Sequence, residues 1–298
     1  MPLTLYAVVP DLSQTGQSLL HRNHYVDYRS ALPWTLESLT FANIDIARVR
    51  HNQDLFLLLC SASFVESGSD LYTHNLIEHF DGDQELQDWL REHWEHEELQ
   101  HGRALAAYVR HVWPEFDWDT GFKAFWDDYG ALCTNEQLEP SRGLELAARC
   151  VVETGTASLY RALNDIVDEP VLKQLTRHIK SDEVRHYKHF YQAFRRYRES
   201  ERLGRYKVFR AILRRVNEIR HEDSDIALRH VFNQCYPQHK DNKAEFQKVV
   251  GPAQALLRRH IPAEMMVKML LKPLDLPPRL QQSLEKPLAK ISEKLFLQ

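Results

Sequence analysis

The chain has 298 residues, of which 43% are hydrophobic and 27% charged; this composition is typical of a globular protein and excludes a disordered chain. Its formal net charge of −4 excludes a broadly basic nucleic-acid-binding protein. Four scattered cysteines without a Cys-x-x-Cys pair exclude a disulfide framework, a zinc ribbon and a rubredoxin-like iron centre. Only ten glycines occur, and the apolar residues recur at helical spacing, which predicts an all-α fold.

Residues 1–42 contain Pro, Ser and Thr breakers, which predict a segment that wraps the surface. The opening residues "MPLTLYAVVPDL" lack the basic start and the longer apolar run of a signal peptide. The most apolar run, Leu55 to Val65, is shorter than the ~20 residues that span a bilayer. We therefore expect a cytoplasmic protein with no membrane segment and no nucleic-acid partner.

Helical periodicity continues from residue 43 to residue 198, interrupted by turn signals. The predicted helices are Asn43–Phe80, Gln84–Val112, Arg142–Val167 and Val171–Arg198, with a connection of short helical pieces over 115–140. Two hairpins with short turns, joined by a longer crossover, predict a four-helix bundle of the ferritin-like kind over residues 43–198. Residues 199–298 predict further helices that pack on the bundle and break at Pro237, Pro252 and Pro262.

Two predicted helices carry charged residues on the stripe that they should bury. In the fourth helix, steps of three and four pass through Leu172, Leu175, Ile179, Glu183, His186, Phe190, Ala193 and Tyr197. In the second helix they pass through Leu86, Leu90, Trp94, Glu98, His101, Leu105, Tyr108 and Val112. A buried carboxylate without a partner is costly, so these residues should have a proton or a cation nearby.

The first hairpin supplies one partner. Its turn centres on Gly82, and Glu98 and Glu66 lie sixteen residues after and before that glycine, so an antiparallel hairpin brings them level. Asp70, one turn from Glu66, is an alternative, but it lies opposite Trp94.

The second hairpin repeats the arrangement around Asp168, with Glu153 and Glu183 fifteen residues to either side. Glu153 also lies on the apolar stripe of its own helix. The four carboxylates would repel one another in an apolar interior without cations. Together with the two imidazoles they form a donor set that suits two ions of iron or manganese. The alternative is a structural bundle in which these side chains only pair with one another.

The motifs "EELQHG" and "DEVRH" closely resemble the paired motifs of the acyl-carrier-protein desaturases, within the soluble di-iron oxidases and oxygenases. The resemblance covers about residues 43–198. It implies two iron ions (or manganese with iron), O2 as co-substrate, and the metal ligands Glu66, Glu98, His101, Glu153, Glu183 and His186.

The resemblance also implies roles for three neighbouring residues. Glu97 and Asp182 precede the motif glutamates, where acids in the family often hydrogen-bond the metal histidine of the opposite motif. Thr156 matches a desaturase threonine near the oxygen-binding side and is a candidate catalytic proton relay. The alternatives are two ordinary exposed acids and a small residue that permits close helix packing.

Other members of the superfamily fit less well. Leu105 stands where a ribonucleotide reductase radical tyrosine is expected, and Ile179 where arylamine N-oxygenases carry an extra histidine. The expected function is an O2-activating oxidase or oxygenase that acts on an organic substrate by desaturation, hydroxylation or N-oxygenation. The desaturase-like motifs favour an acyl or carrier-tethered substrate. The alternative is a ferroxidase or other metal-handling ferritin-like protein.

Residues Arg195 to Arg220 include ten Lys or Arg and three acids, and we expect Leu203, Tyr206, Phe209, Leu213 and Val216 to form a core face within them. This basic segment is either a solvated helix face or a dock for an acidic partner, such as an acyl carrier protein or a ferredoxin. Electrons are expected from an external ferredoxin or reductase, and the protein is expected to be a homodimer.

Overall fold

The computed structural model describes residues 33–219 and 223–297, so most of the predicted wrapping segment, residues 1–42, lies outside the described residues. Every regular element within these ranges is helical, which confirms the all-α prediction. The α-helices are α1 (Ile46–Val49), α2 (Gln53–Ser67), α3 (Asp70–His79), α4 (Gln84–Trp89), α5 (Glu95–Val112), α6 (Trp118–Gly130), α7 (Arg142–Ile166), α8 (Pro170–Ser200), α9 (Arg205–Ile219), α10 (Asp223–Cys235), α11 (Lys243–His260), α12 (Ala263–Leu271) and α13 (Pro278–Leu297). The short turns are η2 (Leu36–Ser38), η3 (Phe41–Asn43), η4 (Leu90–Trp94), η5 (Asn135–Gln137), η6 (Pro237–His239) and η7 (Lys272–Leu274).

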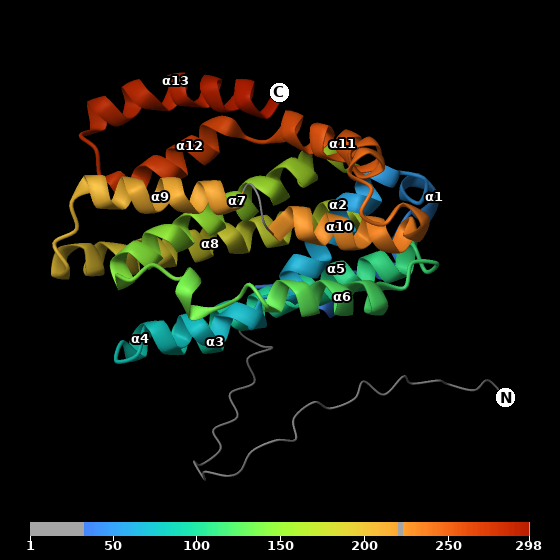
Figure 1. Ribbon diagram of the computed structural model, residues 1–298, viewed down its shortest axis with the longest axis horizontal. Helices are drawn as coiled ribbons and strands as arrows, with labels where there is room; N and C mark the ends of the chain where they lie inside the picture. The colour runs from blue at the N-terminus through green and yellow to red at the C-terminus, as the bar shows by residue number, and fades with distance from the viewer. Residues whose placement is uncertain (1–32, 220–222, 298) are drawn as a thin grey trace, which may run out of the picture. The chain divides into compact units, whose positions relative to one another are not determined.

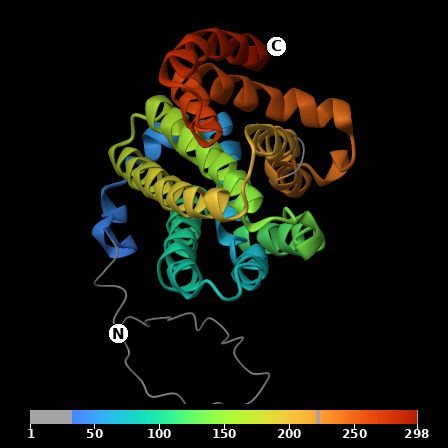
Figure 2. The same ribbon diagram turned by 90° about the vertical axis from the view of Figure 1, so that its left-hand side faces the viewer.

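Two helical pairs form the centre of the described structure. Helix α2 packs along α5, α7 packs along α8, and contacts between α5 and α8 join the pairs (Figure 1). The later helices α10, α11 and α12 pack against α2 or α7, and α13 packs on α11 and α12. Figure 2 shows α12 and α13, in orange and red, on the side of α7 that faces away from α3 and α4.

Local backbone conformation and side-chain caps set the turns of both hairpins. Gly82 has a φ of +87°, a left-handed conformation that suits glycine, and Asp83 caps the next helix by accepting a hydrogen bond from the amide of Leu86. At the second turn Glu169 accepts from two amides of α8, whose first residue is Pro170. These turns confirm the two predicted hairpins.

The first predicted helix, Asn43–Phe80, is wrong as a single element. The chain forms α1, α2 and α3 instead, and α2 ends at Ser67 immediately after Glu66. Gly68 caps this end, where three carbonyls of the last turn converge on its amide. The break places Glu66 in the final turn of α2.

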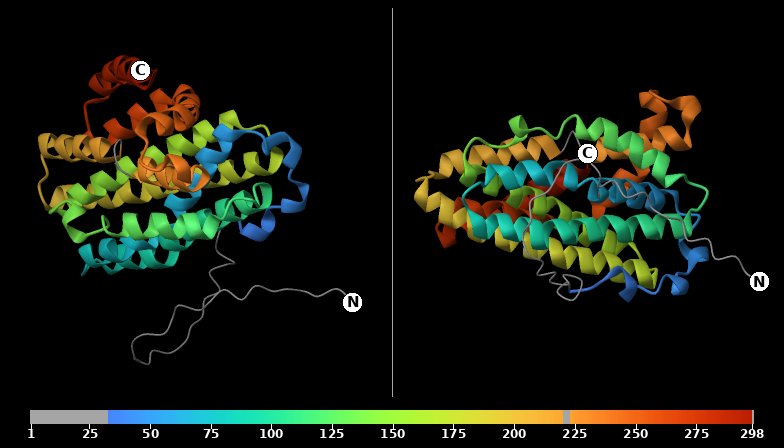
Figure 3. Two further views of the ribbon diagram at one scale, coloured as in Figure 1. Left: turned by 45° about the vertical axis from the view of Figure 1, so that its right-hand side comes forward. Right: turned by 90° about the horizontal axis from the view of Figure 1, so that it is seen from below.

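The second predicted helix, Gln84–Val112, is continuous but not uniform. A π-helical turn, η4, lies between α4 and α5, and it ends just before Glu97 and Glu98. A π turn adds a residue to the helix and is often found beside functional sites. Figure 3, in its view from below, shows the α4–α5 segment alongside the α2–α3 segment.

Two further expectations need correction. The connection over 115–140 holds a full helix, α6, which packs on α2, α5 and α10. Helix α11 runs through Pro252 without ending there, since an interior proline removes one backbone hydrogen bond but does not oblige a helix to stop. Pro237 and Pro262 do lie between helices, as predicted. In the described ranges, no helix is long and apolar enough to cross a membrane.

Candidate metal centre

The charged residues on the two apolar stripes are buried, as the periodicity predicted. Glu98 and His101 on α5 and Glu183 and His186 on α8 are at most 6% exposed. Their apolar neighbours on the same stripes are buried too, except Tyr197, which is half-buried. The cost of removing these carboxylates from water must therefore be offset inside the protein.

The hairpins bring the remaining two carboxylates to the same level. Glu66, from the last turn of α2, and Glu153, from the middle of α7, are 4% and 1% exposed. The six side chains form two groups whose potential ligand atoms lie within 4.8 Å of one another: Glu66, Glu98, His101 and Glu183, and Glu98, Glu153, Glu183 and His186. Because Glu98 and Glu183 belong to both groups, each could bridge two ions.

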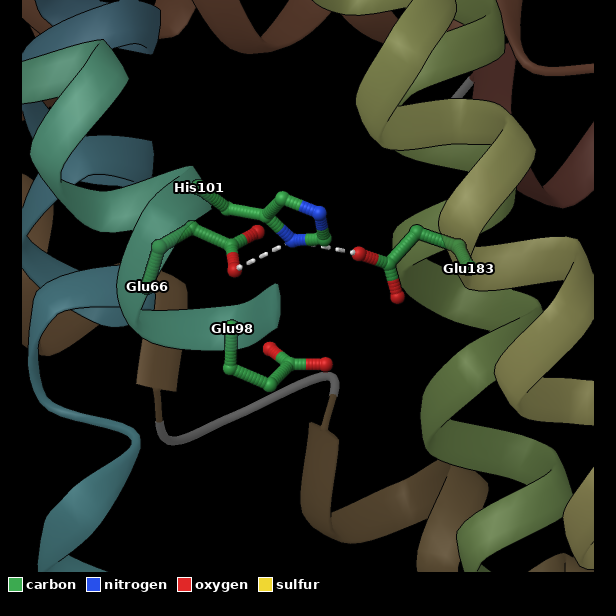
Figure 4. A group of neighbouring side chains, drawn as sticks. All are labelled: Glu66, Glu98, His101 and Glu183. Carbon is green, nitrogen blue, oxygen red and sulfur yellow. Dashed lines mark ion pairs between the residues drawn. The ribbon is translucent and has the colours of Figure 1, made fainter. Parts of the chain in front are cut away.

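The first group surrounds Nδ1 of His101. This atom lies 3.2 Å from Oε1 of Glu183 and 3.6 Å from Oε2 of Glu66. Figure 4 shows both contacts, with the Glu98 carboxylate below the imidazole. Two helical pairs therefore contribute to one cluster, since Glu183 belongs to α8 and the others to α2 and α5.

The second group surrounds Nδ1 of His186 in the same way. Nδ1 lies 3.1 Å from Oε1 of Glu98, 3.6 Å from Oε2 of Glu153 and 3.8 Å from Oε2 of Glu183. Each histidine thus turns Nδ1 toward the shared carboxylates.

The outward nitrogens of both histidines are held by acids from the opposite motif. Nε2 of His101 lies 3.0 Å from Oδ2 of Asp182, and Nε2 of His186 lies 2.7 Å from Oε2 of Glu97. A carboxylate that accepts a hydrogen bond from Nε2–H of a neutral imidazole keeps the proton on Nε2. The lone pair of Nδ1 then faces the centre. These are the hydrogen bonds that the resemblance implied for Glu97 and Asp182.

The orientation of the inner atoms fits metal ligation. Nδ1 of both histidines, Oε2 of Glu153 and Oε1 of Glu183 are buried and make no hydrogen bond with the described residues. Two pairs of them lie within ion-pair distance: Nδ1 of His101 and Oε1 of Glu183 are 3.2 Å apart, and Nδ1 of His186 and Oε2 of Glu153 are 3.6 Å apart. Buried polar atoms are almost always paired, and these four atoms belong to the two overlapping groups that could hold a metal ion.

Electrostatics point the same way. Burial and the charge of Glu183 raise the pKa of Glu98 well above its usual value. Burial likewise raises the pKa of Glu153 to about 8, despite the imidazole of His186 nearby. The surrounding carboxylates raise the pKa values of His101 and His186 well above their usual value, and both imidazoles lower the pKa of Glu183. Protons on the histidines therefore balance part of the negative charge, and divalent cations could take their place.

Three residues around the centre make contacts that were not foreseen from the sequence. Nη2 of Arg185 donates to Oε1 of Glu97 at 3.0 Å, while its Nη1 lies 2.6 Å from Oδ1 of Asp182, so one guanidinium holds both outer acids. Nε1 of Trp34 donates to Oδ2 of Asp182 at 2.6 Å, and the hydroxyl of Tyr160 donates to Oε1 of Glu66 at 2.5 Å.

These three residues differ in how clearly the sequence indicates a contact with the centre. Arg185 stands inside the motif "DEVRH", where its charge three residues after Asp182 could have been noticed. Tyr160 lies on the buried stripe of α7, but a stripe does not say which buried hydroxyl meets a carboxylate. Trp34 stands in a segment without helical periodicity, so only the folded chain places it.

Thr156 lies beside the shared carboxylate. Its hydroxyl donates to Oε2 of Glu183 at 2.8 Å and is also within 3.4 Å of the carbonyl of Val152. The side chain is half-buried. Thr156 can therefore hold a proton at the edge of the centre, although it is not among the potential metal ligands.

Close packing of α2 against α5 keeps the carboxylates of Glu66 and Glu98 at the same level of the helices. A Cβ atom on Gly102 would lie 2.7 Å from the backbone nitrogen and Cα of Ser67. Only glycine, which has no side chain, allows this approach. Gly102 directly follows His101, and Ser67 directly follows Glu66.

No family model and no curated protein matches the chain. The geometry therefore carries the assignment alone: two overlapping groups of buried carboxylates and imidazoles could hold metal ions.

Proposed function

We propose that this protein is an O2-activating non-heme di-iron oxidase or oxygenase that acts on an organic substrate. In this proposal α2, α5, α7 and α8 form a ferritin-like four-helix bundle, and Glu66, Glu98, His101, Glu153, Glu183 and His186 hold two iron ions, or manganese with iron. The observation that carries the proposal is the set of four buried donor atoms without hydrogen-bond partners, turned toward one point from α5, α7 and α8.

When bound, the metal pair would supply the electrons and the open coordination sites that O2 chemistry requires. The protein's own side chains do the rest. Asp182 and Glu97 fix the tautomers of His101 and His186, and Arg185 keeps both acids in place. Apolar neighbours such as Leu105 and Ile179 are fully buried and keep bulk water away.

Thr156 and Tyr160 are the two hydroxyls beside the ligands. The Thr156 hydroxyl holds a proton at Oε2 of Glu183, where it could pass to a developing anion. Tyr160, by donating to Oε1 of Glu66, leaves the other oxygen of that carboxylate to face the centre. An acyl or carrier-tethered substrate, with external electrons, remains the class that the motifs favour.

The experiment that tests this function is anaerobic loading with Fe(II), followed by metal analysis and stopped-flow absorption on mixing with O2. We expect two iron ions per chain and a transient visible band. We also expect the loaded protein to melt at a higher temperature than the chelated protein, because ligands that bind only the folded state stabilise it.

Glu98→Ala and Glu183→Ala should abolish paired metal binding, since each removes a shared carboxylate. Asp70→Asn is the matched control, because Asp70 is exposed at the start of α3 and should leave metal content unchanged. Iron loading far beyond two per chain would instead favour the metal-handling alternative. A chelated protein of undiminished melting temperature that refuses both iron and manganese would leave only a structural bundle.

A further inference from the structure

Helix α9 presents an apolar stripe to solvent. Tyr206, Phe209 and Leu213 are 72%, 47% and 48% exposed, and their spacing places them on one face of the helix. The expectation that these three residues form a core face is wrong, because α9 packs on α7 through Val208, Ala211 and Ile212. Of the residues assigned to that face, Leu203 is buried and Val216 half-buried.

Basic side chains lie on the same helix as this stripe. Helix α9 carries five Lys or Arg and one acid, although the whole chain has a net charge of −4. Lys207 and Arg210 are exposed, one turn apart, and lie beside the apolar residues. We call Tyr206, Phe209 and Leu213 with Lys207 and Arg210 the α9 face. A local positive field around an apolar centre is complementary to an acidic protein surface.

A series of neighbouring side chains, some buried and some half-buried, leads inward from α9. Nη2 of Arg215 lies 3.5 Å from Oε2 of Glu145, whose Oε1 accepts from Nε of Arg149 at 2.9 Å. Glu145 is completely buried and Arg149 is 7% exposed. The guanidinium carbon of Arg149 then lies 5.8 Å from the ring centre of Tyr72.

Aromatic rings complete the series. The ring centres of Tyr72 and Trp94 are 5.9 Å apart, and those of Trp94 and His186 are 6.5 Å apart. The series from Arg215 to His186 therefore joins the α9 side of the protein to the candidate metal ligands.

We propose that the α9 face docks a small acidic electron-transfer protein, such as a [2Fe–2S] ferredoxin, which reduces the metal centre. The inference rests on the proposed function. The contacts from Arg215 to His186 form a path of neighbouring side chains. Electrons can cross such a path, whereas a tethered substrate needs an open channel. The α9 face thus fits an electron donor better than a carrier that must insert its cargo.

The redox step moves electrons and no atoms. One reduced [2Fe–2S] cluster gives up one electron and becomes oxidised, and one metal ion at the centre gains that electron. Two docking events therefore reduce a pair of ferric ions to the ferrous state that reacts with O2.

Docking can be tested on the metal-free chain, with an acidic plant-type [2Fe–2S] ferredoxin as the probe and isothermal titration calorimetry as the readout. We expect Lys207→Glu/Arg210→Glu to weaken binding at least tenfold at low salt, with the difference shrinking at high salt as charges are screened. Phe209→Ser/Leu213→Ser should weaken binding at every salt concentration.

The matched control is Lys243→Glu/Arg258→Glu, which makes the same change in net charge on exposed residues of α11. This control should bind like the wild type. Equal losses in both double variants would overturn the proposal, because the effect would then come from net charge alone. Absence of ferredoxin binding to the wild-type chain at low salt would also overturn it.

Three further outcomes would assign the α9 face to another occupant. The chain could bind anionic lipid vesicles, bind an acyl carrier protein, or form a dimer. Each outcome counts only if Lys207→Glu/Arg210→Glu abolishes it and leaves ferredoxin binding unaffected. In the iron-loaded protein, the variant should lose reduction by ferredoxin but keep reduction by dithionite. Since docking is measured without metal, failure of docking and failure of metal binding are distinguishable.

Discussion

The indole nitrogen of Trp34 and the imidazole of His101 converge on the same oxygen, Oδ2 of Asp182, at 2.6 and 3.0 Å. Trp34 and His101 also lie with parallel rings, 6.1 Å between centres and 3° between planes. The acid beside the other histidine, His186, is held differently: among the described residues, Arg185 donates to Glu97 and no indole does. The two halves of the centre are therefore built differently, and substitutions should separate them.

Trp34→Phe removes the hydrogen bond to Asp182 and keeps an aromatic ring. We expect metal affinity to fall by roughly 10-fold at one of the two positions, because outer partners of metal histidines typically contribute 10–100-fold. Anaerobic Co(II) titration, followed by absorption, would resolve the two binding steps. Trp113→Phe is the control, since Trp113 is equally buried and donates to the carbonyl of Arg50 away from the centre; an equal loss there would contradict the specific role of Trp34.

Two glycine substitutions should change the free energy of unfolding in opposite directions. Gly102→Ala places a methyl group 2.7 Å from the backbone of Ser67, and we expect a loss of about 1–3 kcal/mol in the free energy of unfolding, as for other overpacked sites. Gly155→Ala, in α7, meets nothing within 4 Å and should gain up to ~1 kcal/mol from helix propensity. Urea unfolding measures both, and a neutral Gly102→Ala would mean that α2 and α5 can separate freely.

His189 predicts a loss of stability in mild acid. Its ring stacks on Trp89 with centres 3.7 Å apart, and burial lowers its pKa to about 4. Because the pKa in the unfolded chain is higher, about 6.5, the unfolded state takes up the proton first as the pH falls. Stability contributed by the neutral ring is therefore present above about pH 6.5 and is lost between pH 6.5 and 4.

Between pH 7 and pH 5 this loss should amount to about 1 kcal/mol, reduced from the full linkage value because the ring is partly exposed. His189→Gln should remove that part of the pH dependence in urea unfolding of the chelated protein. His74→Gln, at an exposed histidine of α3, is the control and should leave the slope unchanged. An identical slope in His189→Gln and the wild type would refute the prediction.

Thr156→Val removes the hydroxyl at Oε2 of Glu183 and keeps the shape of the side chain. If Thr156 relays a proton, metal content should stay at two ions per chain while less of the consumed O2 is used productively, and the release of hydrogen peroxide should rise several-fold. Thr156→Ser should restore coupling. Unchanged oxygen uptake and peroxide release in Thr156→Val would leave the residue with a packing role only.

The sequence alone was sufficient for the all-α fold, the hairpin turns and the meeting of the six candidate ligands. These features depend on local rules: a helix repeats every 3.6 residues, and a short turn sets which residues of a hairpin lie level. Glu66 and Glu98 could be paired by counting from Gly82, even though the helix before that turn is broken at Gly68. The break and the π turn change the helices but keep the level of these residues.

Only the tertiary structure decided what lies around the ligands and which face of α9 is buried. Trp34 and Tyr160 reach the centre from segments distant in sequence, and no periodicity encodes which distant groups meet. In α9, one apolar face contains Val208 and Ile212, and another contains Tyr206 and Phe209. Either face satisfies helical periodicity, so the packing of α9 against α7 selects which one enters the core and which one remains in water.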